Sequence, residues 1–165
     1  MRKVIDNAWF SRKTAELANG MYVLAVSILK NEADAEDAIQ NALLLAYRNL
    51  DKLRMFDKFK PWLFKILTNE CYKIINARKY SDDIENISLE AGESCLETET
   101  KMTLWETIKS LPEDYRTVMV LFYYEDMKIT EIASVLNVSE DTVKKRLSRA
   151  REKLRRLLDE EDFYE

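Results

Sequence analysis

The stretch from 130 to 156, TEIASVLNVSEDTVKKRLSRAREKLRR, constrains the fold of this chain most, because it has the pattern of a helix-turn-helix. Ala133 is small where two helices must cross closely. Four residues later, Asn137 stands where the turn needs a residue that tolerates the left-handed region. Ser139 is a good N-cap for a second helix, which follows at once. The stretch therefore predicts two short-linked helices that pack against each other.

The second of these helices is amphipathic and strongly basic. Its buried face is predicted to be apolar and to consist of Val143, Leu147, Ala150, Leu154 and Leu157. Its other faces carry hydrogen-bonding and basic side chains, namely Thr142, Lys144, Lys145, Arg146, Arg149 and Arg151. Between 140 and 158 there are eight Lys or Arg against three Asp or Glu. Such a helix suits a DNA major groove, although an ordinary amphipathic helix with a solvated basic face is the alternative.

The composition favours an all-α protein. The chain has only two glycines and two prolines, and apolar residues recur at helical spacing nearly throughout. No apolar run approaches the roughly 20 residues of a membrane span, and the N-terminus has no signal-peptide core, so we expect a soluble cytoplasmic protein. Cys71 and Cys95 have no metal-ligand spacing and His is absent, which argues against a zinc site or a His-based catalytic centre. No cofactor and no disulfide are expected.

Charge is segregated along the chain, whose net charge is −4. Residues 52–80 hold eight basic and two acidic side chains, whereas residues 81–100 hold seven acidic side chains and no Lys or Arg. The acidic stretch, with Gly92, is typical of a linker. The pattern predicts two basic helical modules joined by an acidic tether.

The N-terminal part predicts a helix from Ala15 to Leu29 and a second helix over 35–49, capped by Asp34. The exposed face of the second helix has Leu44 at its centre. The polar residues around it are Asp37, Gln40, Asn41 and Arg48. A leucine ringed by polar side chains resembles a small protein-binding surface, but an isolated surface leucine is equally common.

A basic and aromatic loop, residues 50–60, precedes a helix that Pro61 is expected to open. The predicted core side of this helix is formed by Leu63, Phe64, Leu67, Cys71 and Ile74. The opposite side carries two aromatics, two amides and two lysines: Trp62, Lys65, Asn69, Tyr72, Lys73 and Asn76. These residue types suit stacking on unpaired bases, hydrogen bonds to base edges and contacts to phosphates. The alternative is that Trp62 and Tyr72 pack beneath another helix.

Four segments in this order resemble the bacterial RNA polymerase sigma factors of the extracytoplasmic function (ECF) class. Residues 34–47 resemble region 2.2, 62–79 regions 2.3 and 2.4, 110–133 region 4.1 leading into 4.2, and 142–155 the recognition helix of region 4.2. The resemblance implies an all-α fold with two small helical domains. These are a region 2 bundle over 1–80 and a region 4 helix-turn-helix domain over 101–165, joined by the acidic linker 81–100.

The resemblance implies a non-enzymatic role in promoter-specific transcription initiation. The expected partners are core RNA polymerase, through its β′ clamp helices and β flap, promoter DNA and an anti-sigma factor, with no small-molecule substrate. The acidic linker would then mimic RNA along the path of the nascent transcript. A free-standing regulator that binds an operator without polymerase is the main alternative, but such a protein needs neither the aromatic face nor the acidic linker. An enzyme acting on nucleic acid is disfavoured, since no carboxylate cluster or nucleophile pair stands out.

The resemblance also implies roles for individual residues. Polymerase contacts are expected from Asp37, Gln40, Asn41 and Leu44. Contacts to the −10 element and its opened strand are expected from Lys52, Leu53, Trp62, Lys65, Asn69 and Lys73. On the recognition helix, Thr142, Lys145 and Arg149 are expected to face −35 bases, and Lys144, Arg146 and Arg151 to hold phosphates.

Several positions depart from the family pattern. Asn41 stands where Glu is usual, and Leu53 where an aromatic residue is common, so these two contacts are expected to differ from those of the family. Asp126 and Asn137 replace glycines, and Lys128 replaces a Ser or Thr cap.

Overall fold

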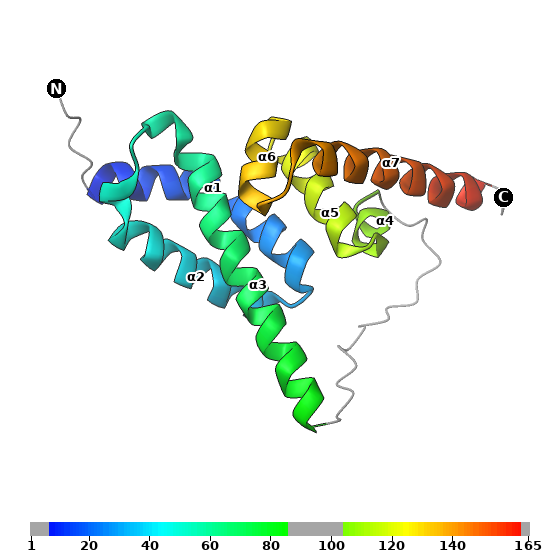
Figure 1. The fold of residues 1–165 in the computed structure, drawn as a ribbon, viewed down its shortest axis with the longest axis horizontal. Coiled ribbons are helices and arrows are strands. Elements are labelled where there is room, and N and C mark those ends of the chain that lie inside the picture. Colours follow the sequence, from blue (N-terminus) through cyan, green and yellow to red (C-terminus); the bar gives the residue numbers. More distant parts are fainter. Residues whose placement is uncertain (1–6, 86–103, 163–165) are drawn as a thin grey trace.

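The structure is a computed structural model that describes residues 7–85 and 104–162, and the regular structure in these two ranges is entirely helical (Figure 1). The predicted all-α class is thus confirmed. The N-terminal module contains α1 (Asn7–Leu29), α2 (Glu32–Arg48), the 3₁₀ turns η1 (Leu50–Lys52) and η2 (Phe56–Lys58), and α3 (Phe59–Glu85). The C-terminal module contains α4 (Leu104–Ser110), α5 (Glu113–Met119), η3 (Val120–Tyr124), α6 (Ile129–Leu136) and α7 (Glu140–Asp162).

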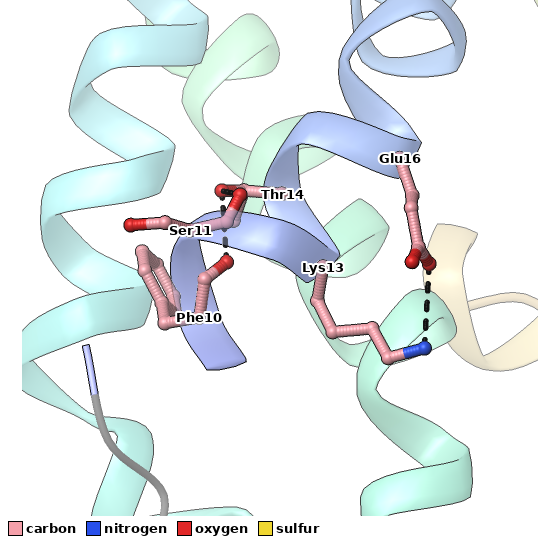
Figure 2. A network of polar contacts seen from close by, with 5 residues as sticks. All are labelled: Phe10, Ser11, Lys13, Thr14 and Glu16. Carbon is pink, nitrogen blue, oxygen red and sulfur yellow. Dashed lines mark hydrogen bonds and ion pairs between the residues drawn. The ribbon is translucent and has the colours of Figure 1, made fainter. Parts of the chain in front are cut away.

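Helix α1 begins two turns before the predicted start at Ala15, which was wrong. Trp9 lies edge-on to Phe56 and Phe59, with ring centroids 5.3 and 5.0 Å apart, so this end of the helix is fixed by aromatic packing. Figure 2 shows the polar contacts along the same turns. The Thr14 hydroxyl donates to the Phe10 carbonyl at 2.9 Å, and the Lys13 ammonium lies 3.3 Å from the Glu16 carboxylate.

Helix α2 is capped by Asn31 and not by Asp34, so that prediction was also wrong. The Asn31 side-chain oxygen accepts a hydrogen bond from the Asp34 backbone N–H at 2.9 Å, and the helix begins at Glu32. The Asp34 carboxylate instead pairs with the Arg78 guanidinium of α3. Asp34 therefore ties α2 to α3, a long-range contact that its neighbours in the sequence could not indicate.

Helix α3 begins at Phe59, two residues before Pro61, and continues to Glu85. Its predicted core side is confirmed at Leu63, Phe64, Leu67 and Cys71, which are all fully buried, while Ile74 is half-buried. Burial raises the pKa of the Cys71 thiol to about 12. The first five residues of the acidic stretch, 81–85, belong to this helix, and the remainder, like Cys95, lies outside the described residues.

The helix-turn-helix is present as predicted. Asn137 ends α6 in the left-handed region, with φ 54°, and the Ser139 hydroxyl accepts a hydrogen bond from the Thr142 N–H at 3.1 Å. Of the predicted stripe on α7, Val143, Leu147 and Ala150 are buried, and Leu154 and Leu157 are half-buried against the core. Short-range capping and turn preferences therefore suffice to define this motif.

The two modules pack directly against each other (Figure 1). Helix α1 contacts α5 and η3, and α3 contacts α6. Among the described helices, none combines the length and apolar character that a membrane span requires.

Candidate functional site

A groove of about 610 Å³ lies between α2 and α3. It holds most of the aromatic, amide and basic side chains that the sequence placed on the exposed side of α3. These residues are Trp62, Asn69, Tyr72, Lys73 and Asn76, joined by Lys52 from η1. We call this set the α3 groove. Its residue types can stack on a base, hydrogen-bond to a base edge and hold a phosphate, as single-strand binding requires.

Of the six residues predicted for strand contacts, Lys52, Trp62, Asn69 and Lys73 line the α3 groove. Lys65 lines a neighbouring pocket together with Trp62. Leu53 is half-buried and packs against the hydrophobic core.

Glu70 is a groove residue that the sequence analysis missed. It is only 8% exposed, and its carboxylate lies 2.7 Å from the ammonium of Lys73, one helical turn away. The i, i+3 spacing of an acid and a base was the available signal. Glu70 holds Lys73 over the groove and adds a hydrogen-bond acceptor to its wall.

The alternative in which aromatic residues of α3 pack beneath another helix is correct in part. Burial, followed by the nearby Glu113 carboxylate, raises the pKa of Tyr72 well above its ordinary value. Glu113 belongs to α5 of the other module, so Tyr72 lies near the contact between the modules. Trp62 is half-buried, with its ring centroid 6.0 Å from that of Phe59 and part of its surface in the groove.

A second surface lies on α2, where Leu44 is 55% exposed. Asp37, Gln40 and Asn41 are exposed on the same helix. The four alanines on the opposite face, Ala35, Ala38, Ala42 and Ala46, are fully buried. Small side chains on that face bring α2 close to its neighbours, and the Leu44 face is left in solvent. A large apolar side chain within a polar rim is suited to binding another protein.

The third surface is the exposed side of α7. Lys144, Lys145 and Arg149 are exposed, and Thr142 is half-buried near the N-terminus of the helix. Lys145 and Arg149 lie opposite the buried Val143 and Leu147 on the helical wheel. The structure therefore leaves a basic helix face available to a DNA groove.

Two arginines of α7 are held by residues that the sequence analysis did not connect with them. The Arg151 Nε donates to the Tyr123 hydroxyl at 2.6 Å, and its guanidinium lies 5.5 Å from the ring centroids of Phe122 and Tyr123. The Arg146 guanidinium lies 3.7 Å from the Asp114 carboxylate. These partners lie 28 and 32 residues away, beyond the reach of any local pattern. The contacts with Tyr123 and Asp114 restrict the positions that the guanidinium groups of Arg151 and Arg146 can reach.

Groups of carboxylate, Cys or His side chains that could bind a metal ion do not occur in the described ranges 7–85 and 104–162. The α3 groove, the Leu44 face and the exposed side of α7 carry side chains suited to binding nucleic acid or another protein.

Comparison with protein families gives two matches in the order expected from the sequence. Residues 15–80 match the model of sigma-70 region 2, and residues 101–154 match the model of sigma-70 region 4. The second match spans the helix-turn-helix, and the first spans the α3 groove and the Leu44 face.

Two curated relatives come from Bacillus subtilis. The ECF RNA polymerase sigma factor SigW is 34% identical over 84% of this chain and 82% of its own. The RNA polymerase sigma factor SigV is 32% identical over 86% of both chains. The similarity therefore covers both modules.

Two solved structures are also similar. The sigma factor RpoE of Bartonella quintana, solved in complex with the anti-sigma factor NepR, has a TM-score of 0.76 at 25% identity, covering 91% of this chain and 96% of that one. CnrH, solved in complex with the cytosolic domain of CnrY, has a TM-score of 0.65 at 26% identity, covering 93% of this chain and 90% of that one.

Proposed function

The chain belongs to the ECF family of RNA polymerase sigma factors, and we propose that it binds core RNA polymerase and directs it to promoters by recognising −35 and −10 elements. The observation that carries this proposal is the presence, in one chain, of a groove suited to unpaired bases and a helix suited to duplex DNA. A protein that starts transcription must read a duplex and hold a melted strand. An operator-binding regulator needs only the first.

The Leu44 face is the proposed polymerase contact. Leu44 supplies the apolar centre, and Asp37, Gln40 and Asn41 supply the polar rim. The β′ clamp helices are the proposed partner of this face, and the β flap that of the C-terminal module. This arrangement matches the usual anatomy of protein interfaces, with an apolar anchor inside hydrogen-bonding groups.

The α3 groove is the proposed site for the melted −10 strand. Trp62 would stack at the edge of the opened duplex, and Asn69 would hydrogen-bond to a base edge. Lys52, Lys65 and Lys73 would hold phosphates. Leu53, which replaces a common aromatic residue, would give an apolar wall in place of a second stacking surface.

The exposed side of α7 is the proposed −35 reader. Thr142, Lys145 and Arg149 would face base edges, with Arg149 placed to reach a guanine. Lys144, Arg146 and Arg151 would hold phosphates and set the register of the helix. Since Arg151 is held by Tyr123, its phosphate contact would be made in a fixed direction.

Arg149 and Arg151 are expected to behave differently although they are two residues apart. Arg149→Ala should cost about 1–3 kcal/mol at one −35 base pair and relax the preference there. Arg151→Ala should weaken all promoters alike and reduce the slope of the salt dependence by about one. Transcription from a promoter library varied across the −35 element measures both effects. If Arg149→Ala lowers every variant equally, Arg149 does not contact a base.

Net charge separates this function from that of an operator-binding regulator. With a net charge of −4, the chain lacks the basic excess that usually drives unaided binding to duplex DNA. We therefore expect the free chain to bind promoter duplexes weakly and core polymerase tightly.

The decisive experiment is transcription in vitro on fragmented genomic DNA of the source organism, with core polymerase in the presence and absence of the chain. New transcript 5′ ends that share a two-part upstream motif are expected only when both proteins are present. Footprinting with the chain alone is the control. Specific protection of the same sites at physiological salt without polymerase would favour the operator-binding regulator.

An anti-sigma factor is a further proposed partner. Two structurally similar proteins, RpoE of Bartonella quintana and CnrH, were solved in complex with NepR and with the cytosolic domain of CnrY, respectively.

The proposed function, transcription initiation, is carried out in the cytoplasm, where polymerase and promoters are found. It requires no catalytic residue of this chain, because polymerase performs the chemistry.

A further inference from the structure

An acidic side chain lies in the wall of the α3 groove. Glu70 lines the groove although it is only 8% exposed. A carboxylate at this depth is costly unless it is paired. The side chain of its partner, Lys73, is 69% exposed, and an ion pair with an exposed partner contributes little to stability. Packing and pairing therefore give a weak reason for a charge at this position, and binding of a ligand gives a stronger one.

The carboxylate of Glu70 has unused acceptor positions. A carboxylate has about four lone-pair positions and no donor. The Lys73 ammonium takes one of them at 2.7 Å, and within the ranges 7–85 and 104–162 the carboxylate has no second hydrogen-bond partner from the protein. About three acceptor positions are thus left for a bound molecule. Such a molecule must supply hydrogen-bond donors.

The other polar side chains of the groove tolerate any base. The indole of Trp62 can stack on every base, because each base has a π face. The amides of Asn69 and Asn76 both donate and accept, so they can match different base edges. Among the described residues that line the groove, Glu70 alone has a side chain that only accepts. Glu70 is therefore the residue that can select a base by the donors of that base.

Guanine is the base that complements a carboxylate best. In an unpaired strand the Watson–Crick edge is free to be read. On this edge guanine presents two adjacent donors, N1–H and the N2 amino group, which match the two oxygens of one carboxylate. Adenine and cytosine present one amino group each. Thymine presents a single N–H between two carbonyl oxygens, which a carboxylate repels.

We propose that Glu70 is a specificity-determining residue of the α3 groove and selects an unpaired guanine in the melted −10 strand by accepting from N1–H and the N2 amino group. The proposal rests on the proposed function, which places that strand in the groove. The Lys73 ammonium has three N–H donors. It can hold the carboxylate with one donor and keep its proposed phosphate contact with the others. Glu70 then reads a base while Lys73 contacts the backbone.

Glu70→Gln tests the proposal with little change in side-chain shape. Glutamine keeps one acceptor oxygen and offers the second guanine donor an N–H group in place of an oxygen. Glu16→Gln is the matched control, because Glu16 also pairs with a lysine at i, i+3 spacing, Lys13, but on α1 and outside the groove. Thermal unfolding of the three chains checks that the fold is retained.

The first measurement is transcription in vitro from a promoter in which each base of the −10 element is varied in turn. The wild type and Glu16→Gln should prefer guanine at one position by about tenfold, as expected for one bidentate contact. Glu70→Gln should reduce that preference to about twofold or less and leave the preferences at the other positions unchanged. A ratio between promoter variants does not depend on the fraction of active chain, so partial unfolding of a variant does not affect it.

Lys73→Gln separates base reading from positioning. It should weaken transcription from all −10 variants alike and keep the guanine preference, as loss of a phosphate contact does. If Glu70 served only to hold Lys73, Glu70→Gln would have this same uniform effect, and the proposal would be overturned. A wild type without a guanine preference at any position of the −10 element would overturn it as well.

The second measurement needs no polymerase. Fluorescence anisotropy at low salt compares binding of the free chain to a short single-stranded thymine oligonucleotide that contains one guanine, or one hypoxanthine, which lacks only the N2 amino group. The wild type should bind the guanine oligonucleotide about fivefold more tightly, and Glu70→Gln should bind the two within about twofold. Wild-type binding that does not distinguish them would overturn the proposal.

The two measurements keep this proposal distinct from the proposed function. A guanine preference that Glu70→Gln removes, in a chain that directs no transcription, would refute the proposed function and leave the reading of guanine by Glu70 in place. Transcription by the wild type without a guanine preference would refute the role of Glu70 and leave the proposed function in place.

Discussion

Leu44→Asp should weaken binding to core RNA polymerase by about 30-fold or more, because a buried apolar anchor at the centre of an interface contributes about 2 kcal/mol or more. Leu44 is 55% exposed in the free chain, so the substitution should leave the free energy of unfolding nearly unchanged. Binding of labelled chain to core polymerase measures the loss, and thermal unfolding checks the fold.

The matched control is Leu104→Asp, which places the same charge at an equally exposed leucine, 58% exposed, on α4. This variant should bind core polymerase within a few fold of the wild type. If the two variants lose affinity equally, the Leu44 face is not the specific anchor. If neither loses affinity, Leu44 is an isolated surface leucine.

Trp62→Ala should leave the closed promoter complex nearly intact and reduce strand opening about tenfold or more, because stacking on one unpaired base contributes about 1–3 kcal/mol. The physical reason is that the indole would contact a base only after the duplex has melted. Permanganate footprinting of unpaired thymines, at saturating holoenzyme, measures the opened fraction.

Trp62→Phe separates stacking from packing, since it retains an aromatic face next to Phe59. Phe should restore most of the opening that Ala removes. Unchanged permanganate reactivity in Trp62→Ala would mean that this side chain serves packing, either in its own module or against α6. A parallel loss of closed-complex binding would place Trp62 on duplex DNA instead.

Local chemistry was sufficient to predict several elements. The helix-turn-helix follows from Asn137 in the left-handed region, Ser139 as an N-cap and the spacing of the apolar stripe on α7. The core side of α3 follows from helical periodicity in the same way. Each of these signals acts over at most a few turns, so the sequence contains it in full.

Local chemistry failed where distant residues decided the outcome. Helix α1 begins at Asn7 and not at Ala15, because Trp9 packs on Phe56 and Phe59. Asp34 pairs with Arg78, 44 residues away, and leaves the cap to Asn31. In the first case a tertiary contact accompanies the longer helix. In the second case the cap itself is a local contact, because Asn31 is as good an N-cap as Asp34.

Two helical modules, their buried faces and the residue types on three exposed surfaces follow from local sequence patterns. How the modules meet depends on contacts between residues far apart in the chain. A glycine in α1 and a glutamate 105 positions later carry no shared pattern, yet a Cβ at Gly20 would overlap the Glu125 carboxylate. The same contact sets Trp62 of α3 beside Thr130 of α6. Contacts between modules depend on the shapes and charges of the surfaces of two folded modules. No periodicity along the chain encodes the complementarity of those surfaces.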